Sequence, residues 1–145
     1  MDLRDYEIRE IILRGMQGFR NPLLKAMVAK DKFHFEGKQL TPFNIAWYIA
    51  PVINSVTRMG SFEERDLLFR AMTDQYKEFD YKKRDGSIVK ENIYDRAARL
   101  AKNIKSRQDK QRDIVFDELK DSVDLNDKVV ILESQKAQSG LVVQS

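Results

Sequence analysis

The feature that most constrains this 145-residue chain is a long periodic segment between about residues 88 and 122. Its apolar side chains recur at spacings of three, four or sums of these, which is the period of an amphipathic helix. They are Ile93, Ala97, Leu100, Ile104, Val115 and Leu119. A helix of roughly 30 residues would be about 45–50 Å long, at a rise of about 1.5 Å per residue. That length predicts a connector between two bodies.

The apolar stripe of this segment is interrupted between Ile104 and Val115. At about 100° per residue, the positions on the inward face are Arg107, Gln108 and Gln111. One interpretation is that this stretch leaves the core and is solvated, as in helices that bridge domains. The other is that Arg107 and Gln111 line a groove, where a guanidinium can make forked hydrogen bonds to phosphate or carboxylate. The residues alone leave both interpretations open.

The rest of the chain predicts short helices that pack together. A helix near the N-terminus, which Asp2 can cap, ends at Gly15 and Gly18. Cap-plus-proline signals at residues 21–22 and 41–42 begin two more helices. A capping box at residues 61–64 begins a fourth, which extends to about residue 73.

Three further stretches predict loops or strands. Residues 31–40 predict a loop or a small hairpin, and residues 78–86 a charged loop that ends in an Asp-Gly turn. Residues 129–132, Val-Val-Ile-Leu, predict a buried β-strand near the C-terminus. A lone strand has no sheet to pair with, so it indicates the start of a truncated α/β domain. The expected fold is therefore mainly α, with one long connector helix and this terminal strand.

The composition excludes several classes of function. The chain has no cysteine, which excludes disulfide frameworks and thiol nucleophiles and fits a reducing cytoplasm. It has a single histidine, His34, and its acidic residues form no D-x-D cluster, so we expect no metal site and no catalytic residue. The net charge is only +3, so any affinity for nucleic acid must come from local clustering. No apolar run approaches a membrane span, and a cytoplasmic protein is expected.

The stretch from Ile49 to Gly60 combines an apolar run with two polar residues, Asn54 and Arg58. Because the residue before proline avoids helical geometry, Pro51 predicts an extended Ala50 and an irregular but buried segment after it. In one interpretation Asn54 and Arg58 face a ligand, since burying them unpaired is costly. In the other, Arg58 pairs with an acid such as Glu63 or Glu64 and Asn54 caps a turn. Residue chemistry alone favours the second.

For His34, Trp47 and Tyr48, we favour a structural role over a functional one. His34 is expected to be a partly buried loop residue, and Trp47 and Tyr48 are expected to be core residues, not platforms for base stacking. Basic residues on the long segment alternate with aspartates, which is typical of a solvated face as much as of a nucleic-acid surface.

The order and spacing of five segments carry a family resemblance. They are Leu3 to Arg9 with Gly15; Leu40-Thr41-Pro42 with Ile49-Ala50-Pro51; Ile53-Asn54 with Arg58-Met59-Gly60; Leu100-Ala101-Lys102-Asn103 with Arg107-Gln108; and Lys128 to Leu132. Together they resemble the middle of RecJ-type single-strand exonucleases, in the DHH phosphoesterase superfamily. On this resemblance, residues 1–87 correspond to the C-terminal part of a DHH domain. Residues 88–122 correspond to the connector helix, and residues 123–145 to the start of the DHH-associated domain.

The resemblance implies a mechanism for a parent protein, of bacterial or phage type, that acts in DNA repair and recombination. Two Mn²⁺ or Mg²⁺ ions would activate water for 5′–3′ hydrolysis of single-stranded DNA. The metal-binding aspartates and the Asp-His-His triplet of the family have no counterpart here, so this chain would bind no cofactor and supply positioning. Asn54 and Arg58 would contact phosphate, and Arg107 and Gln108 would brace the connector helix or touch the strand. Its partners would be single-stranded DNA, the DHH catalytic domain and the DHH-associated domain.

Two rival functions stay open. One is a segment of a different DHH phosphoesterase that acts on short oligonucleotides or cyclic dinucleotides. The other is a non-catalytic helical adaptor that binds DNA or a protein partner.

Overall fold

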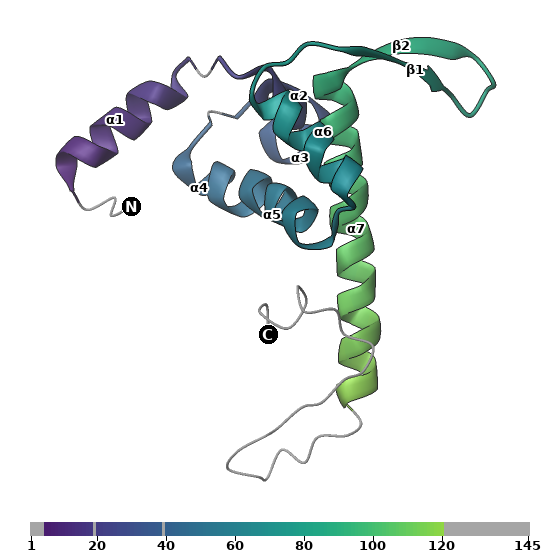
Figure 1. Ribbon diagram of the computed structural model, residues 1–145. Helices are drawn as coiled ribbons and strands as arrows, with labels where there is room; N and C mark the ends of the chain where they lie inside the picture. Colours follow the sequence, from purple (N-terminus) through teal and green to yellow (C-terminus); the bar gives the residue numbers. More distant parts are fainter. Residues whose placement is uncertain (1–4, 19, 39, 121–145) are drawn as a thin grey trace.

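The computed structural model describes residues 5–18, 20–38 and 40–120 (Figure 1). The fold is mainly α, as predicted. Its elements are α1 (Tyr6–Met16), α2 (Pro22–Lys30), α3 (Lys32–Phe35), α4 (Pro42–Asn44), a π-helical turn η1 (Ile45–Ile49), α5 (Ala50–Met59), α6 (Phe62–Met72), β1 (Glu78–Lys82), β2 (Ile88–Asn92) and α7 (Ile93–Lys120). The strand expected at residues 129–132 lies outside the described residues. Within the described ranges, no helix combines the length and apolarity that crossing a bilayer would require.

The long helix α7 forms the axis of the molecule, and α2, α5 and α6 pack against its N-terminal half (Figure 1). It contributes Ile93, Ala97, Ala98, Ala101 and Ile104 to the core, each at most 3% exposed. Across from them lie Leu23 and Met27 of α2, Val56 of α5, and Leu68 and Ala71 of α6. The small alanine side chains allow three helices to approach one side of α7 closely.

The prediction of one long helix is confirmed, because α7 runs for 28 residues. It begins at Ile93 and not at about residue 88. After Gln108 its side chains are mostly exposed, with Ile114 and Phe116 at 62% and 66%. The C-terminal part of α7 therefore projects from the helical body, as Figure 1 shows.

A β-hairpin precedes α7 where a charged loop and the start of the helix were expected. Strands β1 and β2 pair antiparallel, with Glu78 opposite Asn92 and Lys82 opposite Ile88. Phe79 and Tyr81 alternate with charged residues along β1, so one face is half-buried and the other exposed. The predicted Asp-Gly turn is present, and its glycine, Gly86, has a φ of +85° that favours glycine.

Two other expectations about local structure are wrong. Residues 32–35 form the short helix α3 in place of a loop or hairpin. Ala50 is helical, with φ −58° and ψ −42°, and Pro51 lies in the first turn of α5. The chain is helical without a break from residue 42 to residue 59, and the π-helical turn η1, which changes the hydrogen-bond pattern of the helix, directly precedes Pro51. The segment from Asn54 to Arg58 is consequently a regular helix, not an irregular one.

The predicted helix starts are confirmed by their caps. The Asn21 side chain accepts a hydrogen bond from the Leu24 backbone N–H at 3.2 Å. Thr41 and Ser61 both form capping boxes with the residue three positions later. The start of α1 differs from the expectation, because its cap is Asp5 and not Asp2; the Asp5 carboxylate accepts from the Glu7 backbone N–H at 3.0 Å. Such signals are readable from sequence because cap and helix are only three residues apart.

The turn after α6 is joined to α7 through Tyr94, whose hydroxyl donates to the carboxylate of Asp74. This hydrogen bond, with smaller effects of burial and negative charge, raises the pKa of Tyr94 from its ordinary value of 10.0 to about 12. A raised pKa means that the pair stabilises the fold fully below pH 10.0 and that this contribution is lost as the pH rises through 12. Ultraviolet titration of tyrosinate should show a late-ionising tyrosine. Asp74→Asn should return its pKa toward 10.0, and a late tyrosine that this substitution leaves unmoved would contradict the assignment.

Candidate functional site

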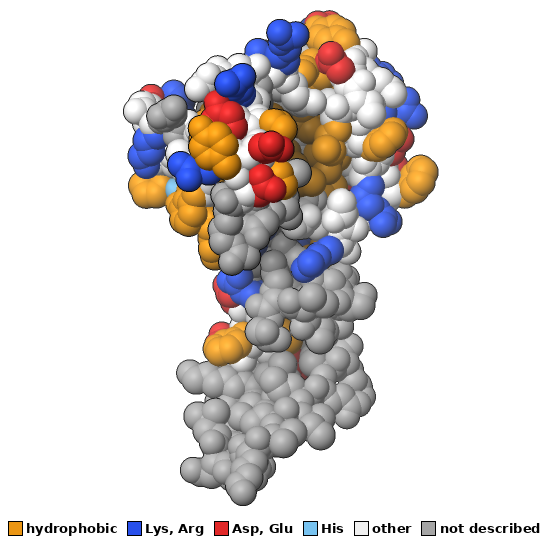
Figure 2. Space-filling model, turned by 90° about the vertical axis from the view of Figure 1, so that its left-hand side faces the viewer, with side chains coloured by type: hydrophobic (Ala, Val, Ile, Leu, Met, Phe, Trp, Pro, Cys, Tyr) orange, Lys and Arg blue, Asp and Glu red, His pale blue; other side chains and the backbone are white. Residues whose placement is uncertain are grey.

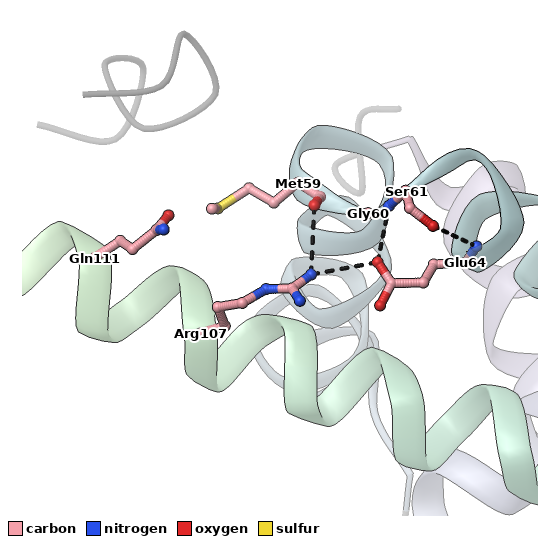
Figure 3. Close-up of a pocket in the computed structure, with 6 residues that line it drawn as sticks. All are labelled: Met59, Gly60, Ser61, Glu64, Arg107 and Gln111. Atoms are coloured by element: carbon pink, nitrogen blue, oxygen red, sulfur yellow. Dashed lines mark hydrogen bonds and ion pairs between the residues drawn. The ribbon is translucent and has the colours of Figure 1, made fainter. Parts of the chain in front are cut away.

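A hollow of about 440 Å³ lies where α5 ends, α6 begins and α7 passes beside them (Figure 3). Its lining residues are Met59, Gly60, Ser61, Glu64, Arg107 and Gln111. We call this hollow the α5–α7 groove. The lining comes from three helices that meet only in the folded chain, and most of its groups are polar.

Arg107 is the cation of the α5–α7 groove. Its Nη2 donates to the Met59 carbonyl oxygen at 3.5 Å and to Glu64 Oε2 at 3.3 Å (Figure 3). Both contacts are long, and half of the Arg107 side chain is exposed. An exposed pair of this kind contributes little to stability, typically about 0–1 kcal/mol. The guanidinium is therefore held only weakly, and it can donate to acceptor atoms of a ligand in place of Met59 and Glu64.

Glu64 has two roles in the groove. Its Oε2 accepts the Ser61 backbone N–H at 2.8 Å as part of the capping box, and the same oxygen accepts from Arg107. The cap fixes Glu64, and Glu64 in turn orients Arg107. The neighbouring Glu63 accepts from the Ser61 hydroxyl at 2.7 Å, and this hydrogen bond lowers the pKa of the Glu63 carboxyl. Glu64 thus competes with an anionic ligand for Nη2 of Arg107, while no hydrogen bond to the described residues engages Nε or Nη1 of this side chain.

The two glutamines that interrupt the apolar stripe point inward, as predicted. Gln108 is 2% exposed, and Gln111 is half-buried in the groove wall. The Nε2 donor of Gln108 and the Oε1 acceptor of Gln111 are buried and find no hydrogen-bond partner within the described ranges. Unpaired buried polar atoms are rare because each costs about 1–3 kcal/mol. Of the two glutamines, Gln111 lines the groove and Gln108 is buried within the helical body.

Asn54 and Arg58 are exposed, although the segment that contains them was expected to be buried. They are four residues apart on one exposed face of α5, whose opposite face buries Ser55 and Val56. Neither side chain makes a hydrogen bond or ion pair with the described residues. The alternative pairing of Arg58 with Glu63 or Glu64 is wrong, since those acids bind Ser61 and Arg107 instead.

Of the four sequence-predicted residues, only Arg107 lines the α5–α7 groove, and Gln108 is buried next to it on α7. Met59, Gly60, Ser61 and Glu64 were missed as groove residues. The signal available for them was the capping box that directly follows the Arg58-Met59-Gly60 segment. It marks a sharp junction between two helices, but only the fold shows that α7 passes beside that junction.

His34 and Tyr48 are partly buried, whereas Trp47 is exposed. His34 is part-buried, with its Nδ1 2.9 Å from the Asp31 carboxylate and its ring stacked on Tyr48 at 3.9 Å. The structural interpretation of His34 and Tyr48 is therefore supported, although His34 lies on α3 and not in a loop. Trp47 is not a core residue, because 65% of it is exposed, beside Phe43 at a ring distance of 5.7 Å. Among the described residues, no group of three or more histidine, aspartate or glutamate side chains could hold a metal ion.

The chain is similar to two curated proteins. One, from Bacillus subtilis strain 168, is provisionally named the SPbeta prophage-derived single-strand DNA-specific exonuclease YorK. The other, from Bacillus phage SPbeta, carries the corresponding provisional name. Each is 31% identical to this chain over 124 residues, which are 85% of the chain and 21% of the relative. The chain thus spans about a fifth of the length of the relatives it matches. No family model matches the sequence, and no solved structure matches the fold.

Proposed function

We propose that this chain is the strand-positioning segment of a RecJ-like, metal-dependent exonuclease of the DHH superfamily that hydrolyses single-stranded DNA from the 5′ end. The observation that carries the proposal is the 31% identity, over 85% of the chain, to the YorK protein named as a single-strand DNA-specific exonuclease. The catalytic Mn²⁺ or Mg²⁺ ions belong to another part of the parent protein in this proposal. The described residues supply contacts to the strand.

The α5–α7 groove has the chemistry that a phosphodiester needs. A phosphate oxygen can replace Glu64 Oε2 as acceptor for the exposed Arg107 guanidinium, which forms forked hydrogen bonds. Gln111, which lines the groove, adds a second polar side chain there. Asn54 and Arg58 extend the contact over the exposed face of α5. Because contacts to phosphate carry no sequence information, binding through them would be independent of sequence.

Exposed apolar side chains support the proposed partnership with the DHH catalytic domain. Helix α1 buries none of its residues, and Tyr6 and Ile11 are 78% and 70% exposed. Phe43 and Trp47 are more than half exposed on α4 and η1. Figure 2, which faces the side occupied by α1 and α4, shows several hydrophobic side chains on that surface. A contiguous apolar surface is a feature of protein–protein interaction sites, and this surface is the one that the proposal assigns to the DHH catalytic domain.

Substitution of Arg107 tests the proposal. Fluorescence anisotropy with a labelled oligothymidylate should show that Arg107→Ala weakens binding by the full chain roughly tenfold to a hundredfold, since hydrogen bonds to charged groups contribute about 1.5–3 kcal/mol. The matched control is Arg112→Ala. It removes the same charge from the same helix, at a residue that pairs with Asp109 and Asp113 outside the groove.

Equal losses in the two variants would show that only bulk charge matters and would remove the groove from the site. If the unsubstituted chain does not bind single-stranded DNA at low salt, the positioning role fails and the helical adaptor takes its place. Nuclease activity itself is tested on the complete parent protein with Mn²⁺, where Arg107→Ala should lower the rate of single-strand digestion and Arg112→Ala should not.

A further inference from the structure

The tip of the β1–β2 hairpin carries three consecutive cations, Lys82, Lys83 and Arg84, all of them exposed. The turn beneath them is closed by two backbone hydrogen bonds. The Lys83 N–H donates to the Ser87 carbonyl oxygen at 2.8 Å, and the Gly86 N–H donates to the Lys83 carbonyl oxygen at 3.0 Å. The three side chains therefore extend from an ordered turn that lies away from the helical body (Figure 1).

The acids of the hairpin form no ion pair with these three cations, and Asp85, which stays ionised in the turn, leaves residues 82–85 with a net charge of +2. Asp80 pairs with Lys90 directly across the strands at 2.6 Å, and Glu78 accepts from the Tyr76 hydroxyl at 2.6 Å. Asp85 accepts from the Ser87 backbone N–H at 2.9 Å and from its hydroxyl at 2.6 Å. No ion pair involves any of the three tip cations in the part of the chain that the structure describes. The tip is thus a local concentration of positive charge in a chain whose net charge is only +3.

The hairpin is fixed to α7 by side chains on its inner face. The Arg96 guanidinium lies 4.4 Å from the ring centre of Phe79, and that of Arg99 lies 4.2 Å from the ring centre of Tyr81. Arg99 also makes two hydrogen bonds to the Glu91 carboxylate, at 2.9 and 2.7 Å. Cation–π contacts and bidentate pairs of this kind hold a specific geometry. The tip is consequently presented at a defined place relative to α7.

We propose that Lys82, Lys83 and Arg84 form a second contact for the phosphate backbone of a single strand, separate from the α5–α7 groove. This inference rests on the proposed function. Ile93, at the base of the hairpin, and Arg107 are 14 positions apart on α7, which is about 20 Å along the helix. Unpaired lysine and arginine side chains bind phosphates through charge and counterion release, without reading sequence. The tip would therefore add affinity for long strands and leave short oligonucleotides to the groove.

The test compares two triple variants of the full chain with a labelled oligothymidylate long enough to span both contacts. The tip variant is Lys82→Gln, Lys83→Gln and Arg84→Gln. The control variant is Lys25→Gln, Lys32→Gln and Lys38→Gln, which removes the same charge from exposed positions on the helical body. The slope of log K against log salt should fall by about 2 in the tip variant, because each neutralised phosphate of a single strand contributes about 0.7. The control should change the slope less, and an oligonucleotide too short to span should not distinguish the variants.

The outcomes separate this inference from the proposed function. If Arg107→Ala weakens binding but the tip variant matches its control, the second contact is overturned and the groove stands. If the tip variant weakens binding and Arg107→Ala does not, the contact at the hairpin tip is supported and the role proposed for the α5–α7 groove is rejected. Equal changes of slope in both triple variants mean that total charge governs binding, which overturns the tip. A chain that does not bind the oligonucleotide overturns both. Far-ultraviolet circular dichroism checks that the variants remain folded.

Discussion

Replacing Ile104 by alanine should lower the free energy of unfolding by about 2–5 kcal/mol. Ile104 is 1% exposed and lies on α7 near the last point where the helix is packed against the body. Removing its buried methyl groups costs the transfer energy of those atoms and adds the cost of the cavity that they leave. Since small proteins are stable by only about 5–15 kcal/mol, a loss of this size is a large share of the total.

The control for Ile104 is the same substitution at Ile114 on the same helix. Ile114 is 62% exposed, so Ile114→Ala should change stability by about 0.5 kcal/mol or less. Urea denaturation followed by circular dichroism measures both variants, and the difference between them removes the shared change in helix propensity. Similar losses in the two variants would show that Ile104 is not buried and that α7 is packed differently.

Replacing Gly60 by alanine should destabilise the chain by about 1–3 kcal/mol and weaken strand binding at the same time. An added Cβ would lie 2.5 Å from the Val56 carbonyl oxygen and 3.2 Å from Val56 Cγ1. The first of these atoms is backbone, and it accepts the hydrogen bond of the Gly60 N–H at 2.8 Å. The end of α5 must therefore shift, and with it the wall of the α5–α7 groove.

Gly15→Ala provides the matched control for Gly60→Ala. Gly15 lies inside α1, and an added Cβ there meets nothing within 4 Å. Because alanine is a better helix former than glycine, this control should be stabilising by roughly 0.5–1 kcal/mol. The measurements are urea denaturation and anisotropy on the same samples. A Gly60→Ala chain as stable as the parent, with unchanged affinity, would show that the junction tolerates the displacement and does not shape the site.

The features that could be predicted from sequence are those that depend on near neighbours. Asn21, Thr41 and Ser61 satisfy backbone groups three residues away, so their helices begin where the residues indicate. The inward direction of Gln108 and Gln111 follows from helical period alone, and it holds in the structure.

The features that were mispredicted depend on competing interactions or on distant parts of the chain. Pro51 was expected to interrupt the helix. In the structure the π-helical turn η1 leads directly into α5, and Pro51 lies in the first turn of that helix. The alternation of Phe79 and Tyr81 with charged residues indicates a strand. Its partner strand, β2, was assigned to the start of the long helix, because the helical pattern follows it directly. Trp47 was expected in the core on hydrophobicity alone, and nothing in the described residues covers most of its ring.

Only part of the candidate site could be predicted from the sequence, because the site also depends on contacts between distant residues. Arg107 and Glu64 are 43 positions apart, and the contact between them exists because α6 and α7 pack together. Arg58 and Asn54 were selected for their chemistry in an apolar run, but the helical period places them on the solvent face of α5. Residue type identified the polar groups, and only tertiary packing decided which of them share a hollow.

The projecting end of α7 sets an angle as well as a distance. From Gln108 to Lys120 the helix rises about 18 Å, at about 1.5 Å per residue. Removing one residue from this part would shorten it by only about 1.5 Å but would turn the point where the chain leaves the helix by about 100°. Seven residues, close to two full turns, would almost restore the original direction. A change of seven residues in this part would therefore alter the length of α7 by about 10 Å and leave the direction in which the helix ends, relative to the groove, almost unchanged.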